Sequence, residues 1–80
     1  MKEIQEIVLM NNIKKLRLDK EITQQQLADK VGVTNRTIIA LEKGHYNPTV
    51  LLAYRIAKVF HLTIEDVFEF EKEEYDENNE

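Results

Sequence analysis

The sequence of 80 residues contains no cysteine, no tryptophan and no long hydrophobic run. Without cysteine the chain has neither a disulfide framework nor a thiolate metal site, and an intracellular, reducing compartment is the natural interpretation. The N-terminus lacks the regions of a signal peptide, and no apolar run approaches the roughly 18 to 20 residues of a membrane span. We therefore expect a soluble, cytoplasmic protein without membrane contact.

Residue patterns that support enzyme chemistry are missing as well. The chain has no glycine-rich phosphate loop, no nucleophile elbow and no carboxylate pair in a plausible cleft. His45 and His61 are 16 residues apart and lack the partner pattern of a zinc site, so we interpret both as surface residues. The short chain forms one small domain with a single modest core. The sequence therefore predicts no enzyme, no cofactor and no metal.

The sequence does contain two short helices joined by a glycine turn, between residues 22 and 44. Thr23 is a good N-cap for the first helix, and Gln26 stands at the third helical position, where a capping box needs Glu or Gln. Gly32 ends this helix at a point where positive φ is required. The apolar face that precedes it consists of Leu27, Ala28 and Val31.

The second helix begins and ends with equally clear signals. Thr34 offers an N-cap, and Val33 is apolar and can plug the turn before it. Ile38 and Leu41 form the buried stripe of the helix, and Gly44 stops it. Two short helices with a tight, glycine-containing turn are typical of a helix-turn-helix.

With these features the chain closely resembles the Xre/Cro family of repressors, the lambda-repressor-like helix-turn-helix domains. The matching segments are 22–28 (ITQQQLA), 31–34 (VGVT), 37–44 (TIIALEKG), 46–49 (YNPT) and 56–60 (IAKVF). The resemblance covers about residues 11–68 and implies an all-α, five-helix DNA-binding domain. It also implies sequence-specific binding to double-stranded DNA as a transcriptional regulator, in the form of a homodimeric repressor on an inverted repeat.

Three further helices complete the predicted domain. The first is capped by Asn11 or Asn12 and runs to about residue 20. The fourth follows Pro48, which is welcome in a first turn, and spans about residues 49–60. Thr63 caps the short fifth helix. The residues expected to face inward are Ile13, Leu16 and Leu18 in the first helix, Val50, Ala53, Ile56, Ala57 and Phe60 in the fourth, and Ile64, Val67 and Phe68 in the fifth.

The two ends of the chain have the patterns of short strands. Residues 6–10 are rich in β-branched and apolar side chains, and residues 68–71 alternate with period two. We expect these segments to pair as a small antiparallel ribbon, the alternative being a frayed N-terminus and an extended fifth helix. The predicted organisation is an N-terminal extension with a strand (1–10), the DNA-binding domain (11–68), and a short strand followed by an acidic, disordered tail (69–80).

Charge is distributed unevenly along the chain. The net charge is −4, but residues 10–60 carry nine basic and four acidic side chains, a balance of +5. Residues 69–80 carry seven acidic side chains and one lysine, a balance of −6. A basic body with an acidic tail can bind DNA if the tail stays off the DNA face. We interpret the tail as a solvated solubiliser, with a DNA mimic that competes for the basic surface as the alternative.

The third helix is expected to enter the major groove by its N-terminal end. Arg36 is the best candidate base reader, because a guanidinium can donate two hydrogen bonds to guanine, and Asn35 has the donor and acceptor that suit adenine. Thr37 and Ala40 complete the base-reading set. Gln24 begins the second helix and is expected to contact phosphate or to brace Asn35 or another base-reading residue. The full set expected to contact the DNA backbone or brace the readers is Gln24, Thr34, Lys43, His45, Tyr46, Asn47, Lys15 and Arg17.

The fourth helix carries the prediction about assembly. It is apolar nearly all round, so it is expected to be buried on more than one side. A two-fold dimer through the fourth and fifth helices would cover it, the alternative being that the terminal ribbon covers it within one subunit. An alternative function keeps the fold as an antitoxin-like or other protein-interaction module. The predicted interface residues are Leu51, Leu52, Val59, Phe68 and Phe70.

Overall fold

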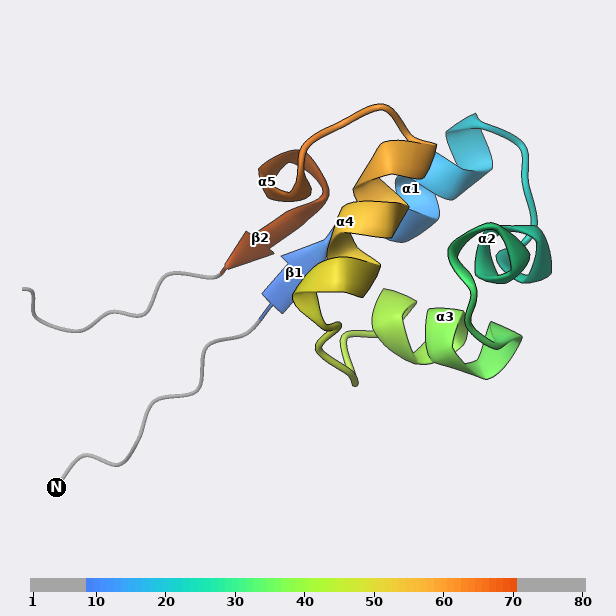
Figure 1. The fold of residues 1–80 in the computed structure, drawn as a ribbon, viewed down its shortest axis with the longest axis horizontal. Coiled ribbons are helices and arrows are strands. Elements are labelled where there is room, and N and C mark those ends of the chain that lie inside the picture. Colours follow the sequence, from blue (N-terminus) through green and yellow to red (C-terminus); the bar gives the residue numbers. More distant parts are fainter. Residues whose placement is uncertain (1–8, 71–80) are drawn as a thin grey trace, which may run out of the picture.

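Five helices and a two-stranded antiparallel ribbon make up residues 9–70, the part of the chain that the computed structural model describes (Figure 1). The predicted fold class is therefore confirmed. The elements are β1 (Leu9–Asn11), α1 (Ile13–Asp19), α2 (Gln24–Val31), α3 (Asn35–Glu42), α4 (Val50–Val59), α5 (Ile64–Val67) and β2 (Phe68–Phe70). The predicted tail from residue 71 onward and the first eight residues of the predicted extension lie outside the described residues.

Threonine side chains begin the two central helices as predicted. The Thr23 hydroxyl accepts a hydrogen bond from the Gln26 backbone N–H, and the Gln26 side-chain oxygen accepts from the Thr23 N–H at 2.7 Å, which completes the capping box. Thr34 accepts from the Thr37 backbone N–H at 3.2 Å. Gly32 ends α2 with φ 77°, a left-handed conformation that costs glycine little. These predicted helix ends are confirmed.

Threonine also begins α4 and α5. The Thr49 hydroxyl accepts from the Leu52 backbone N–H at 3.0 Å. Thr63 forms a second capping box, in which the Asp66 carboxylate accepts from the Thr63 backbone N–H at 3.1 Å. This backbone hydrogen bond, followed by the one between Asp66 and the Thr63 side chain, lowers the pKa of Asp66 from its ordinary value of 3.8.

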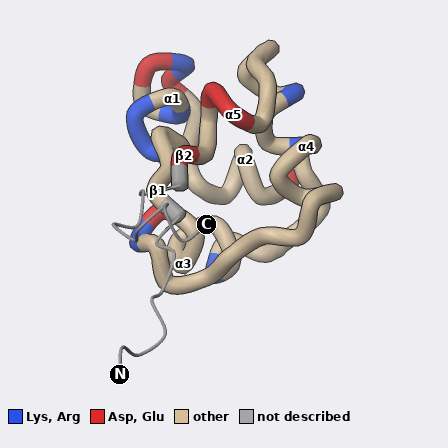
Figure 2. Tube along the Cα trace, turned by 90° about the vertical axis from the view of Figure 1, so that its left-hand side faces the viewer, with Lys and Arg blue, Asp and Glu red and all other residues tan. Residues whose placement is uncertain are grey.

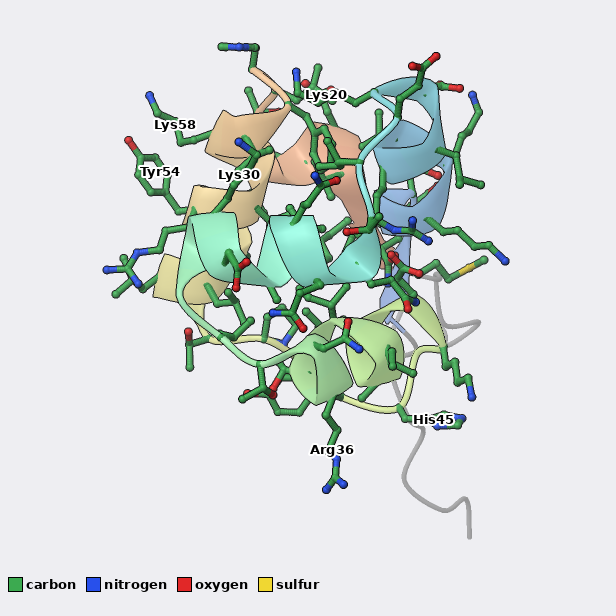
Figure 3. All side chains as sticks on the ribbon, turned by 90° about the vertical axis from the view of Figure 1, so that its right-hand side faces the viewer. Lys20, Lys30, Arg36, His45, Tyr54 and Lys58 are labelled. Carbon is green, nitrogen blue, oxygen red and sulfur yellow. The ribbon has the colours of Figure 1, made fainter. Side chains whose placement is uncertain are left out.

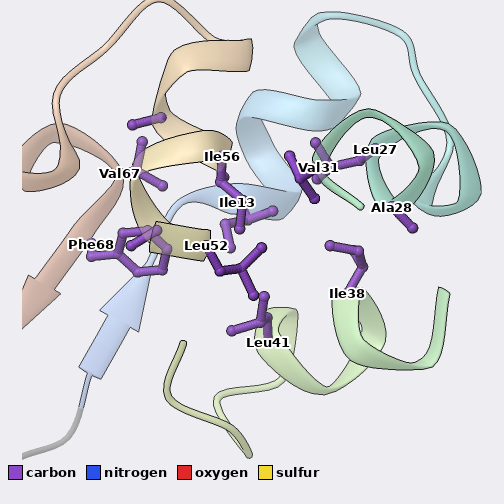
Figure 4. Packing of buried hydrophobic residues seen from close by; sticks show 12 residues of the cluster. Ile13, Leu27, Ala28, Val31, Ile38, Leu41, Leu52, Ile56, Val67 and Phe68 are labelled. Carbon is purple, nitrogen blue, oxygen red and sulfur yellow. The ribbon is translucent and has the colours of Figure 1, made fainter. Parts of the chain in front are cut away.

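All five helices and the first residue of β2 contribute to one hydrophobic core (Figure 4). Its buried members are Ile13, Leu27, Ala28, Val31, Ile38, Leu41, Leu52, Ala53, Ile56, Ala57, Val67 and Phe68. Leu18 and Val50, which were predicted to face inward, are exposed instead. Leu18 is 55% exposed and Val50 is 78% exposed. At about 100° per residue both fall outside the buried arcs of their helices, which are centred on Ile13 in α1 and on Ala53 and Ile56 in α4.

The predicted ribbon forms between β1 and β2, with Leu9 opposite Phe70 and Asn11 opposite Phe68. The alternative of an extended fifth helix is wrong, because α5 ends at Val67 and the backbone of Phe68 is extended. Asn11, the last residue of β1, and Asn12, which follows it, connect this end of the ribbon to the helices. The Asn12 backbone N–H donates to the Val67 carbonyl at 2.9 Å, and the Asn11 side-chain nitrogen donates to the Leu41 carbonyl at 2.9 Å.

The prediction that Leu52 and Phe68 lie in a dimer interface is wrong. Leu52 is 7% exposed and Phe68 is 4% exposed, because the buried arc of α4 includes Leu52 and the ribbon holds Phe68 against the core. Val59 is half-buried and packs against the core. Leu51 is 56% exposed, so within the described residues the ribbon does not cover it. The side chain of Phe70 lies outside the described residues.

Candidate nucleic-acid interface

Helices α2 and α3 approach closely across the turn at residues 32–34. Ala28 is fully buried, and its small side chain leaves space for the crossing. The Val33 backbone N–H donates to the Ala28 carbonyl at 3.0 Å, and the Val33 side chain packs against the core. The left-handed Gly32 redirects the chain between the two helices. This is the geometry of a helix-turn-helix.

The outward face of α3, which we define as Arg36, Ile39, Ala40 and Lys43, is set by what the helix buries. Ile38 is 0% exposed and Leu41 is 1% exposed, so these two residues fix the inner side. At about 100° per residue, Arg36 and Lys43 lie opposite them. Figure 3 shows Arg36 projecting away from the helices behind it. The face thus presents one positively charged side chain near each end of α3. A polyanion can contact both without a change in the fold.

Thr34, Asn35 and Thr37 border this face at the start of α3. Thr34 is exposed, and its hydroxyl lies 3.2 Å from the hydroxyl of Thr37. Asn35 is half-buried, and its side-chain oxygen accepts no hydrogen bond from the described residues. The structure therefore gathers the predicted base-reading residues on one turn and a half of helix, with Arg36 as the most prominent of them.

A buried ion pair lies behind the start of α2 and the end of α3. The Nε atom of Arg17 donates to Glu42 Oε2 at 2.7 Å, and its Nη2 donates to Glu42 Oε1 at 3.2 Å. A third hydrogen bond runs from Nη1 to the Ile22 carbonyl at 3.1 Å. Gln24 joins the network, because its Nε2 donates to Glu42 Oε1 at 3.0 Å. One carboxylate therefore holds α1, α2 and α3 together.

This network corrects two predictions. Arg17 does not reach the DNA backbone, because it is 7% exposed and its guanidinium is bound inside the protein. Gln24 braces Glu42 and not Asn35. Sequence reasoning also missed Glu42 as the partner of Arg17. The available signal was its place in the last turn of α3, where the helix dipole disfavours a negative charge unless a cation compensates it.

The loop after α3 extends the same surface. Lys43, Tyr46 and Asn47 are exposed, and His45 lies on the same side of the molecule as Arg36 in Figure 3. Lys15 is also exposed, but its Nζ atom lies 3.9 Å from the carboxylate of Asp19, so its charge is balanced locally. Three other lysines lie at the far side of the molecule from Arg36 in this view, namely Lys20, Lys30 and Lys58.

The acidic residues of the C-terminal elements lie on other segments than α3. Glu65 and Asp66 lie in the first turn of α5, and Glu69 lies in β2. Figure 2 shows these elements above α3. Both charged residues on the outward face of α3 are cations, and Arg17 compensates the carboxylate of Glu42 behind it. The outward face of α3 itself therefore presents only positive charges to a negatively charged ligand.

Metal-binding and membrane-spanning features are not found among the described residues. Within residues 9–70, histidines and carboxylates do not gather in any group of three that could hold a metal ion. None of the helices in this range has the length and apolar character needed to cross a membrane.

Comparisons with known proteins agree with the geometry. The family model for helix-turn-helix proteins matches residues 13–67. An uncharacterized HTH-type transcriptional regulator from Archaeoglobus fulgidus is 50% identical over 66 residues, 82% of this chain and 93% of the relative. The Bacillus subtilis protein YgzD, named in the same way, is 45% identical over 65 residues, 81% of this chain and 98% of the relative.

A more distant relative is RstR, a transcriptional repressor of the cryptic phage CTXphi from Vibrio cholerae. It is 28% identical over 57 residues, 71% of this chain and 51% of the relative. The residues matched by the family model include the whole of α2, the turn and α3. The chain therefore belongs to the helix-turn-helix family, as its resemblance to the Xre/Cro repressors implied, and it is not an enzyme.

Proposed function

We propose that the protein binds double-stranded DNA in a sequence-specific manner and represses transcription as a homodimer on an inverted-repeat operator. The outward face of α3 carries this proposal, because Arg36 projects from it in Figure 3 and Lys43 is exposed, whereas Ile38 and Leu41 are buried on the opposite side. The names of the relatives support a role in transcription, and RstR is named a repressor. The protein would act in the cytoplasm by occupying a promoter.

Residues on and beside this face read the bases. Arg36 donates two hydrogen bonds to the acceptor pair of guanine, worth about 1 to 3 kcal/mol of discrimination against another base. Asn35 has the donor and acceptor that suit adenine. Ala40 leaves space for a base edge about one turn further along the helix, and Thr37 contacts a phosphate or a thymine methyl group.

The remaining contacts position the helix on the duplex. The N-terminus of α2, at Gln24, points free backbone N–H groups at a phosphate, and the ion pair behind it fixes its direction. Thr34 and Lys43 contact phosphates on either side of α3, Lys15 contacts the flank, and the loop residues His45, Tyr46 and Asn47 contact the next stretch of backbone. These contacts carry no sequence information. We assign DNA binding to the predicted domain of residues 11–68.

The dimer uses an exposed apolar stripe on α4, formed by Val50, Leu51 and Tyr54. These side chains are 78%, 56% and 50% exposed, and their i, i+1, i+4 spacing places them on one side of the helix. Adjacent large apolar residues at the surface indicate an interaction site. A dimer that binds an inverted repeat must hold its two α3 helices about 34 Å apart, on successive faces of the major groove.

Selection from a randomised duplex library at physiological salt tests DNA reading. We expect the wild-type protein to enrich an inverted repeat and Arg36→Ala to lose preference at one position in each half-site. Lys20→Ala is the matched control, because it also removes one positive charge, from an exposed residue at the far side of the molecule from Arg36 in Figure 3. This control variant should enrich the same DNA sequence as the wild-type protein. No enrichment by the wild-type protein would refute sequence-specific binding.

The oligomeric state tests the stripe. Leu51→Glu places a charge in the interface, so sedimentation should show a monomer that binds the operator more weakly, with unchanged helical content. Leu18→Glu is the control, since Leu18 is equally exposed but lies on α1. If Leu51→Glu stays dimeric, the interface lies elsewhere. If the wild-type protein is monomeric and does not select DNA, the stripe instead favours the protein-interaction module.

A further inference from the structure

Ile39 is a partly exposed aliphatic residue in the middle of the recognition helix. Its neighbour Ile38 is 0% exposed, whereas Ile39 is half-buried. It belongs neither to the buried core of the described residues nor to the partly buried apolar residues packed against that core, a set that includes Val33, Val59 and Phe60. The core of the described residues therefore gives no packing reason for a β-branched side chain at this position, although such residues lower helix propensity.

The position of Ile39 places it beside Arg36. Three residues at about 100° each turn Ile39 only about 60° away from Arg36, and three residues at 1.5 Å advance it about 4.5 Å along α3. Successive base pairs are separated by about 3.4 Å. If Arg36 contacts a base pair, Ile39 thus faces a neighbouring one. Ala40, on the other side of Arg36, is too short to compete for the same space.

We propose that Ile39 determines specificity by contacting the 5-methyl group of a thymine next to the guanine read by Arg36. The inference rests on the proposed DNA-reading function and adds one determinant to it. An isoleucine side chain has no hydrogen-bonding group, and the thymine methyl is the one apolar feature that the four base pairs present in the major groove. A β-branched residue in a helix is also held in one main rotamer, so its methyl groups are placed before DNA arrives.

The experiment changes single methyl groups in the DNA without altering hydrogen bonds. After an operator has been selected, each thymine of a half-site is replaced in turn by uracil, and binding is measured by fluorescence anisotropy. For the wild-type protein we expect one thymine whose replacement weakens binding about fourfold, the equivalent of one buried methyl group at about 0.8 kcal/mol. Replacement in both half-sites should weaken binding about fifteenfold, since the two sites are independent.

Variants of the protein assign that methyl group to Ile39. Ile39→Ala should bind the thymine and uracil duplexes equally at this position, while Ile39→Val should keep part of the difference. Leu18→Ala is the control, since it shortens an exposed aliphatic residue on α1 and should leave the uracil profile unchanged. Thermal melting of each variant separates a loss of folding from a loss of contact.

A second measurement uses only the wild-type protein and changes the DNA, so it does not depend on the folding of any variant. Replacing the sensitive thymine by cytosine, with guanine opposite, should weaken wild-type binding, and 5-methylcytosine at that position should recover part of the loss. An operator with an Arg36-dependent guanine but equal uracil profiles for wild type and Ile39→Ala would overturn this inference and leave the proposed function standing. Failure to select any operator would refute the proposed function itself.

Discussion

The ion pair between Arg17 and Glu42 gives the strongest prediction about stability. The side chains are 9% and 5% exposed, so water screens their attraction little. Removing one partner leaves an uncompensated charge that is still buried. Arg17→Met and Glu42→Leu should each destabilise the fold, whereas the double variant replaces the pair by apolar side chains of similar size. We therefore expect the double variant to be far more stable than either single variant.

The expected magnitudes follow from the burial. Breaking a buried pair by removing one partner costs about 3 to 5 kcal/mol, and exchanging both partners for apolar residues is close to neutral. A chain of 80 residues has a total stability of about 4 to 12 kcal/mol. Each single variant should thus lose a large part of this stability and unfold at a clearly lower urea concentration than the wild-type protein. The double variant also removes the acceptor of Gln24, which costs about 1 kcal/mol.

Urea unfolding followed by circular dichroism measures all four members of this cycle. Lys15→Met is the matched control, because Lys15 and Asp19 form an exposed pair at 3.9 Å with side chains 74% and 70% exposed. Its removal should change the free energy of unfolding by less than about 0.5 kcal/mol. If Arg17→Met costs no more than Lys15→Met, or if the two single losses simply add in the double variant, the pair does not stabilise the helices as argued.

Two further predictions concern helix ends. Gly44→Ala should lower the free energy of unfolding by about 1 to 2 kcal/mol, because Gly44 has φ 77° and open space where a Cβ would lie, so only backbone strain is added. Gly44→Asn should recover most of that loss, and equal losses for both variants would contradict this explanation. Asp66 has a pKa below 3.8 in the folded state because the Thr63 backbone N–H and hydroxyl stabilise its carboxylate. A carboxylate whose pKa is lower in the folded than in the unfolded state stabilises the fold at pH values above the unfolded pKa. This stabilisation is lost as the pH falls through the folded pKa. The difference in stability between wild type and Asp66→Asn should therefore be constant near neutral pH and shrink in acid. A difference that grows in acid would refute the assigned hydrogen bonds.

Local chemistry made much of the fold predictable from the sequence. Thr23 with Gln26, and Thr34, are short-range signals whose hydrogen bonds close within three residues, so they depend little on the rest of the fold. The left-handed conformation of Gly32 is likewise a local requirement. The outward position of Arg36 followed from the periodicity of α3, because Ile38 identified its buried side.

Predictions failed where a residue had to be assigned between two surfaces that both favour apolar side chains. Leu52 and Val50 are both aliphatic, and the sequence could not show which of them falls in the buried arc of α4. Phe68 suits a core as well as an interface, and only the pairing of β2 with β1 settles its place. The prediction that Arg17 contacts the DNA backbone failed for another reason. A lone arginine is usually solvated, and its partner Glu42 is 25 residues away in the sequence.

The same ion pair connects stability to the proposed DNA contact. Glu42 ends α3 directly before Lys43, so an uncompensated carboxylate there would stand close to the phosphates that the helix approaches. Arg17 supplies the compensating charge from inside the protein, which leaves Lys43 and Arg36 free to set the field of the outward face. A chain with net charge −4 can thus present a cationic face on α3. Among Arg17→Met, Glu42→Leu and the double variant, DNA affinity should consequently fall most for Arg17→Met, even after correction for the fraction of folded protein. Affinity should recover in the double variant, which lacks the Glu42 carboxylate as well.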